Sequence, residues 1–300
     1  MMQVNRSLDM TQKQVSKKAA LTAVITALIV GFILSLTVRP LHQDNSSTLA
    51  TENHKGQIRI RWRVPVVFQT TWPVLGDNPV FVSEMIKQAS NGEVVLDIFE
   101  PNEIVPSFSI TDAVRDQKIE AGYTWLGYDQ GKIPAAPLIG AVPFGMEPWE
   151  YSAWWYESGG RELAEKLYKQ HQIHPIYCGM TGPETAGWFR KPIESLSDLE
   201  GLKIRFAGLG GKVIEQLGAS VTMLPGSEIF QALEKGVIDA ADLSDYVANK
   251  SLGLHKVAKY ALVDFHSMPV LSLTVNMNKW NAQPKDIQAI LNMATRDMGT

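Results

Sequence analysis

Aromatic side chains and one arginine stand at the ends of several predicted strands, where they suit a small-molecule cleft. Such clefts are mostly apolar and carry a few placed polar groups. Arginine suits a carboxylate because its planar guanidinium donates two parallel hydrogen bonds. Single aromatics near strand ends more often belong to a core, so the pattern alone leaves the cleft a hypothesis. The residues are Phe68, Trp72, Trp125, Tyr128, Trp188, Phe189 and Arg205.

Motifs for catalysis are missing from the sequence. The glycine-rich turn of Gly208, Gly210 and Gly211 lacks the spacing of a dinucleotide fingerprint, and no GK[ST] is present. The six histidines form no HExxH and no close cluster with cysteine, so a transition-metal site lacks ligands. Ser227 and Ser267 lie in no nucleophile elbow. We therefore predict a binding protein and not an enzyme.

Composition limits the class of protein further. The 300 residues are 45% hydrophobic and carry a formal net charge of -3, which is typical of a globular protein with a sizeable core. Phosphate binding needs a concentrated basic face, and no basic block appears, so we expect no nucleic-acid partner. The single Cys178 cannot form an internal disulfide and is assigned no chemistry.

The N-terminus predicts export. Lys13, Lys17 and Lys18 precede an uncharged run over residues 19–38, which Arg39 follows directly. The run matches the roughly 20 residues of a spanning helix, and no clean pair of small residues marks a cleavage site. Residues 1–40 are thus either a signal peptide or a membrane anchor over 19–38, and both place the body in the periplasm.

A polar linker is predicted at residues 41–57, because the stretch has no apolar period. From residue 58 onward, strand-like and helix-like segments alternate, which indicates an α/β fold. A capping box at Ser197 and Glu200 is expected to start one short helix. Predicted strands are 58–70, 94–99, 121–126, 174–178, 187–191, 202–206 and 270–276, and predicted helices are 80–90, 110–116, 149–170, 211–217, 227–235 and 246–253.

Six runs in matching order resemble the DctP-type binding proteins of tripartite ATP-independent periplasmic (TRAP) transporters, and particularly the α-keto-acid-binding branch. The resemblance covers the chain from about Trp62 to its end. Six ordered matches are far more specific than one short motif. They are 70–73 (TTWP), 141–146 (AVPFGM), 186–191 (AGWFRK), 199–206 (LEGLKIRF), 231–240 (QALEKGVIDA) and 256–260 (KVAKY).

This resemblance implies a two-lobed periplasmic-binding-protein-like α/β fold, in which crossing strands and a long helix join lobes that close on a ligand like a hinge. The expected ligand is a small organic acid: a keto, hydroxy or related carboxylate. Arg205 stands where the family's arginine pairs with the ligand carboxylate, and Tyr128 and Trp72 are the aromatic contacts we select. Implied partners are the large and small membrane subunits of the transporter, together with a homodimer.

Departures from the keto-acid branch affect the ligand site. Glu184 replaces a glutamine, Asp242 and Leu243 replace a Glu-Trp pair, and Met268 replaces a glutamate. In the family these positions hold the ligand and a bound cation, so Glu184 and Met268 are candidate ligand positions and Asp242 and Leu243 candidate metal positions. No cofactor follows with certainty, and sodium or keto acid cannot simply be carried over.

Two roles for Glu184 stay open. It either joins Asp242 in holding a cation, for which calcium is suited because it favours carboxylate oxygens, or it contacts an amino or hydroxyl group of a ligand whose carboxylate meets Arg205. A solvated loop position is the alternative without function.

The rival hypothesis is a membrane-anchored sensor domain or a small-molecule enzyme. A sensor needs a cytoplasmic output domain, and the 12 residues before Lys13 are too few for one. The sequence also stops inside a helix predicted from residue 284, whereas family members usually continue with further helix. We therefore expect the body at 58–300 to lack C-terminal helix.

Overall fold

The computed structural model describes residues 57–263 and 267–295, which belong to one compact unit. The predicted leader and most of the linker lie outside these residues. Within the described ranges, no helix has both the length and the hydropathy needed to cross a membrane.

Lobe I holds the first and last parts of the described chain. Its last strand, β10, lies between β3 and β4 and is antiparallel to both. The parallel pair of β1 and β2 joins this sheet through a bridge between Val66 and Tyr123. The strands are β1 (Ile60–Pro65), β2 (Val94–Phe99), β3 (Ala121–Trp125), β4 (Ile173–Met180) and β10 (Val270–Asn276).

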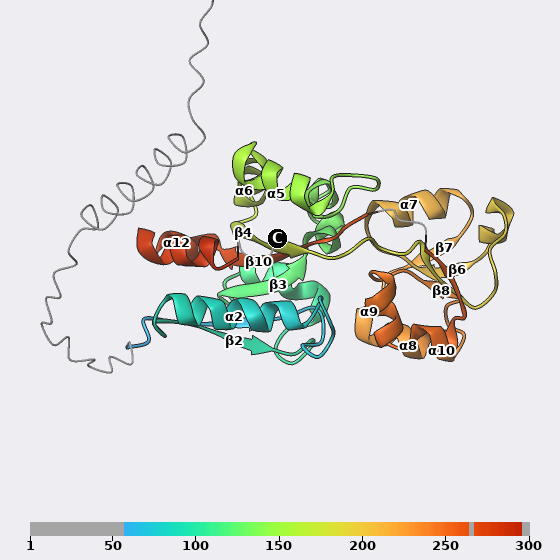
Figure 1. Cartoon of the computed structure of the whole chain (residues 1–300), viewed down its shortest axis with the longest axis horizontal. Coiled ribbons are helices and arrows are strands. Elements are labelled where there is room, and N and C mark those ends of the chain that lie inside the picture. The colour runs from blue at the N-terminus through green and yellow to red at the C-terminus, as the bar shows by residue number, and fades with distance from the viewer. Residues whose placement is uncertain (1–56, 264–266, 296–300) are drawn as a thin grey trace, which may run out of the picture. The chain divides into compact units, whose positions relative to one another are not determined.

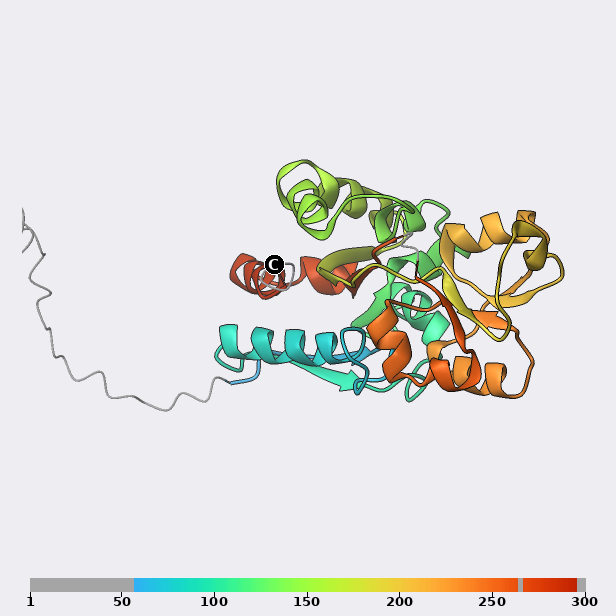
Figure 2. The same ribbon diagram turned by 45° about the vertical axis from the view of Figure 1, so that its right-hand side comes forward.

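Helices lie on both sides of the central strands β4, β10 and β3 of lobe I, with α5 and α6 above these strands and α2 below them in Figure 1, and Figure 2 shows the same layers from another side. Strand β10 is buried along its whole length, and its side chains up to Val275 are apolar or small, as expected for a central strand. The helices are α2 (Asp77–Ala89), η1 (Ser107–Ser109), α3 (Ile110–Arg115), η2 (Leu126–Gly131), α4 (Ala136–Gly140), α5 (Pro148–Glu157), α6 (Gly160–Lys169), α11 (Met277–Asn281) and α12 (Lys285–Met293).

Lobe II is a second α/β layer built from the intervening chain. Strand β6 pairs in parallel with β7 and β8, and β5 is antiparallel to β8 and β9. Helix α7 lies on the other side of the strands from α8, α9 and α10 (Figure 1). The elements are β5 (Gly187–Phe189), η3 (Leu196–Leu199), β6 (Lys203–Arg205), α7 (Gly208–Gln216), β7 (Ser220–Thr222), α8 (Gly226–Glu234), β8 (Ala240–Ala241), α9 (Tyr246–Ser251), α10 (Leu254–Val257) and β9 (Tyr260–Leu262).

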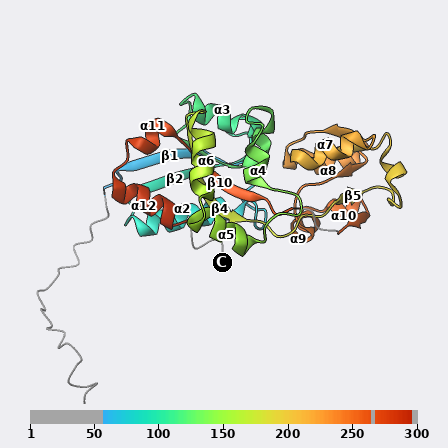
Figure 3. The same ribbon diagram turned by 90° about the horizontal axis from the view of Figure 1, so that it is seen from above.

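Two segments connect the lobes and run side by side. The chain leaves lobe I after β4 and returns to it before β10, as Figure 3 shows. The Thr181 amide donates to the Pro269 carbonyl at 2.9 Å, and the Glu184 amide donates to the Ser267 carbonyl at 2.9 Å. This paired connection has the form of the predicted hinge. The long helix implied by the resemblance is not found in the described ranges, where the longest helix, α2, has 13 residues.

Two local predictions were wrong. The helix predicted at 149–170 is two helices, because Gly159 adopts φ 87° between them and a side chain at Gly160 would collide with the Trp154 ring, 2.6 Å from Cε3. The capping box is formed by Ser195 and Asp198, where the Ser195 amide donates to Asp198 Oδ2 at 2.7 Å. Glu200 lies at the other end of that one-turn helix.

Candidate ligand-binding site

The cavity that brings the candidate residues together lies between the lobes, beside their paired connection. The space there that protein atoms do not fill is about 520 Å³, open solvent included. Both lobes and both crossing segments contribute to its wall. The lining residues are Phe68, Leu75, Trp125, Tyr128, Ala141, Pro143, Glu184, Arg205, Phe206, Ala207, Gly208, Leu209, Gly210, Asp242, Leu243, Ser267, Pro269 and Leu271.

Arg205, the last residue of β6, is 1% exposed and held on three sides. Its Nε donates to the Leu224 carbonyl at 3.1 Å, Nη1 donates to the Asp242 carbonyl, and Nη2 donates to the Tyr128 hydroxyl at 3.2 Å. A guanidinium has five N–H donors. One N–H on each terminal nitrogen therefore has no partner among the described residues, and the two suit the two oxygens of one carboxylate.

Tyr128 belongs to an aromatic wall that faces Arg205. Its ring meets Trp125 edge to face, with centroids 4.9 Å apart, and lies 6.2 Å from Phe68 and 5.1 Å from Phe108. Burial raises the pKa of Tyr128 above its usual value, so the hydroxyl stays neutral. The wall keeps water from the guanidinium and strengthens its attraction for an anion.

Glu184 and Asp242 are the acidic groups of the cavity, and both are buried. Glu184 Oε2 accepts a hydrogen bond from Ser267 Oγ at 2.6 Å. Burial, and secondly the nearby Asp242 carboxylate, raise the pKa of Glu184 well above its ordinary range, against the opposing effects of Ser267 and Arg205. The solvated-loop alternative for Glu184 is therefore wrong.

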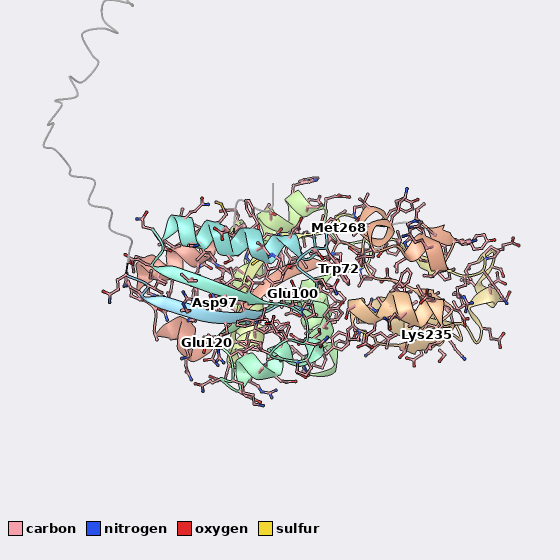
Figure 4. All side chains as sticks on the ribbon, turned by 90° about the horizontal axis from the view of Figure 1, so that it is seen from below. Trp72, Asp97, Glu100, Glu120, Lys235 and Met268 are labelled. Atoms are coloured by element: carbon pink, nitrogen blue, oxygen red, sulfur yellow. The ribbon has the colours of Figure 1, made fainter. Side chains whose placement is uncertain are left out.

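Five of the seven predicted site residues line the cavity: Arg205, Glu184, Tyr128, Asp242 and Leu243. The other two do not. Met268 is a buried residue between two lining residues, and Trp72 lines a separate pocket between the 69–73 turn and helices α8 to α10. Figure 4 shows both near the boundary between the lobes. Contact between these side chains and a ligand remains a prediction.

Sequence reasoning missed Ser267 and the turn at Gly208 and Gly210 as cavity residues. The turn was considered only for phosphate and Ser267 only as a nucleophile. Sequence proximity could have identified both. The turn follows Arg205 closely in the sequence, and Ser267 directly precedes Met268, which was already a candidate ligand position.

Two α/β lobes, a paired connection and a buried arginine in the cavity between them define the class of two-lobed ligand-binding proteins. Residues 73–300 match the family of bacterial extracellular solute-binding proteins, family 7, or DctP. The chain belongs to this family, which confirms the main hypothesis of the sequence analysis over the sensor or enzyme. The family description also agrees with the predicted location outside the cytoplasm.

Individual relatives agree with this assignment. A monocarboxylate 2-oxoacid-binding periplasmic protein of Nostoc sp. PCC 7120 is 36% identical over 95% of this chain and 75% of its own. A TRAP periplasmic solute-binding protein from Pseudoalteromonas atlantica T6c, with bound sodium and pyruvate, superposes with a TM-score of 0.77 at 33% identity, over 80% of this chain and 73% of that one.

A third relative, a TRAP solute-binding protein from Bordetella bronchiseptica RB50, is a mixed-occupancy dimer with copurified calcium and picolinate in one site. It superposes with a TM-score of 0.77 at 30% identity, over 81% of this chain and 73% of that one. Bound sodium or calcium thus occurs in structural relatives, which agrees with the bound cation that the sequence analysis considered without assigning a required cofactor.

Proposed function

We propose that this protein captures a small monocarboxylate, of the 2-oxo-acid or a related hydroxy-acid type, and delivers it to the membrane subunits of a TRAP transporter. The observation that carries the proposal is the buried Arg205, which lines an aromatic-walled cavity between the lobes and keeps one N–H on each terminal nitrogen without a partner among the described residues. Pyruvate and the 2-oxoacids of the relatives fit one carboxylate group against such a fork.

Glu184 and Asp242 would hold a cation in the same cavity. Their carboxylate oxygens suit a hard ion such as calcium, and a bound positive charge would offset the burial and the repulsion from Asp242 that together raise the pKa of Glu184. The described residues contain no group of three or more acidic, histidine or cysteine side chains able to hold a metal. Further donors would come from carbonyl and hydroxyl oxygens or from the ligand, and Leu243 could offer only its carbonyl.

A thermal-shift titration tests this function. We expect pyruvate to raise the melting temperature of the purified protein, with picolinate and lactate as further acids, in buffers containing sodium, calcium or neither. A ligand at about 100 times its dissociation constant stabilises the folded state by about 2.7 kcal/mol. Failure of every monocarboxylate to shift the melting temperature in any of these buffers would contradict the proposal.

The remaining parts of the function are proposals of the same kind. Membership of a solute-binding family supports the proposal that the protein has no catalytic activity. An assay for the hydrolysis of small esters tests this. Two neighbouring genes for one large and one small membrane protein would support the transporter partners.

The dimeric Bordetella relative supports a homodimer, which light scattering can measure. Sequencing the N-terminus of the exported protein decides between a cleaved signal and an anchor over residues 19–38.

A further inference from the structure

Trp72, which does not line the ligand cavity, packs instead against the backbone of the opposite lobe. Its turn is held in place because its carbonyl accepts from the amides of Gly76 and Asp77, at 3.0 and 3.1 Å. The indole reaches Gly226, the first residue of α8 in lobe II. A Cβ atom at Gly226 would lie 2.8 Å from Cζ3 and 2.9 Å from Cη2 of Trp72, which is closer than real Cβ atoms come.

A second tryptophan of lobe I makes a similar contact on lobe II. Trp125, at the end of β3, faces Gly208, the first residue of α7, where a Cβ atom would lie 3.1 Å from Cη2. Two helices of lobe II thus begin with a glycine that a lobe I indole abuts. The contacts flank the cavity, because Trp125 and Gly208 line it and Gly226 lies beside the lining residue Leu243.

Gly226 has no conformational need to be glycine. Its φ is not positive, so the backbone of α8 at this position would also accept alanine. The lack of a side chain is explained instead by the approach of Trp72. An indole is rigid and large, so contact with a bare backbone stops the lobes at one defined separation and adds apolar contact at that separation only.

We propose that Trp72 and Gly226 are a positioning pair that sets the closed separation of the lobes and thereby the affinity for the ligand, which neither residue touches. Because only the closed state surrounds the ligand, apparent affinity is reduced by the fraction of protein able to close. The affinity part of this inference rests on the proposed function, whereas the part that concerns lobe separation does not.

The test is Gly226→Ala, with lobe separation and ligand binding measured on the same protein. Spin labels on cysteines introduced at the exposed positions Lys87 in α2 and Lys235 in lobe II report the distance between lobes, and the native Cys178 is buried and will not label. We expect the variant to lose the shortest-distance population, with or without pyruvate. We also expect its pyruvate affinity to fall at least tenfold while its melting temperature without ligand is unchanged or higher.

A smaller ring at position 72 should reverse the effect. In the Gly226→Ala background, Trp72→Phe makes room for the added methyl group, and we expect the short distance and the affinity to return to within about threefold of wild type. Gly131→Ala is the matched control, because a Cβ atom there meets nothing within 4 Å.

The outcomes separate the two proposals. Identical distance distributions in wild type and Gly226→Ala, or a defect that Trp72→Phe fails to relieve, would overturn the positioning role. Loss of the short distance in Gly226→Ala, with relief by Trp72→Phe, supports the positioning role even if wild type binds no pyruvate. A wild-type protein that binds no pyruvate would contradict the proposed ligand class and leave the positioning role standing.

Discussion

Arg205 is fixed by three hydrogen bonds before any ligand arrives, so its fork is pre-organised for a carboxylate. We predict that Arg205→Lys weakens pyruvate binding tenfold or more, because an ammonium offers no planar pair of donors and cannot keep the bonds to Leu224 and Asp242. Calorimetry measures the loss. Arg61→Lys, an exposed change in β1, is the matched control, and unchanged affinity in Arg205→Lys would remove this residue from the site.

Glu184 is the residue at which the two roles left open by the sequence can be separated. Glutamine restores the amide of the keto-acid branch and can still accept the hydrogen bond from Ser267. If Glu184 and Asp242 hold an ion, we expect Glu184→Gln to lose calcium-dependent thermal stabilisation.

If Glu184 instead meets a polar group on the ligand, the same variant should shift preference toward simple keto and carboxylic acids, because repulsion near their charge is relieved. Two unit charges 4 Å apart repel by as much as about 4 kcal/mol at an effective dielectric of 20, which is the upper bound on the effect, and a fraction of it is measurable. A screen of acids with and without calcium distinguishes the roles, and identical profiles for wild type and variant would reject both.

The contact between β4 and α11 predicts how stability depends on pH. His174 in β4 is buried and stacks on Trp280 of α11 with centroids 3.8 Å apart. Burial, and secondly the charge of Arg161, lower the pKa of His174 from 6.5 to about 4. Between these values the unfolded chain binds the proton and the folded chain does not, so this contribution is lost as the pH falls from 6.5 to 4.

We therefore predict that His174→Phe, which preserves the stacking, removes a pH-dependent loss of about 3 kcal/mol that wild type suffers between pH 7 and 4. Urea unfolding across this range measures the free energy of unfolding. Other buried groups, such as Asp129, whose pKa burial raises to about 6, titrate in both proteins and cancel in the difference. Parallel stability profiles would show that His174 does not titrate with folding.

The outer face of β1 carries a row of arginine ion pairs that we predict to add little. Arg61 lies opposite Asp97 in β2 and contacts it at 2.8 Å, with side chains 55% and 32% exposed. Exposed pairs are typically worth at most about 1 kcal/mol. Arg61→Ala should change the free energy of unfolding in urea by less than about 1 kcal/mol, and a larger loss would point to packing of the arginine stem.

At the scale of the whole molecule, both lobes and both crossing segments line the cavity. We therefore expect ligand binding to stabilise all of them against opening. We predict that saturating ligand slows hydrogen exchange at the Thr181 and Glu184 amides by up to about 100-fold at 100 times the dissociation constant. Amides near the ends of α12, which exchange by local opening, should change little. Equal slowing at all these amides would argue against lobe closure as the coupled motion.

The sequence alone determined the alternation of strands and helices and the family. Local periodicity is enough for this, and strands β2 and β10 were predicted with the bounds that the structure has. It also singled out Arg205, because that residue stands in the run 199–206, and Glu184, because that residue departs from the keto-acid branch. Local pattern did not locate the helix boundaries correctly where a glycine or a capping residue interrupts the periodicity, as at Gly159 and Ser195.

Tertiary structure decided which candidates share the cavity. Trp72 and Arg205 belong to equally recognisable motifs, yet only Arg205 lines the ligand cavity, whereas Trp72 meets Gly226 in the opposite lobe. Trp72 lies outside the ligand cavity because it packs against Gly226, which is 154 positions later in the chain. No local pattern encodes that distance, because it depends on how the two lobes fit together.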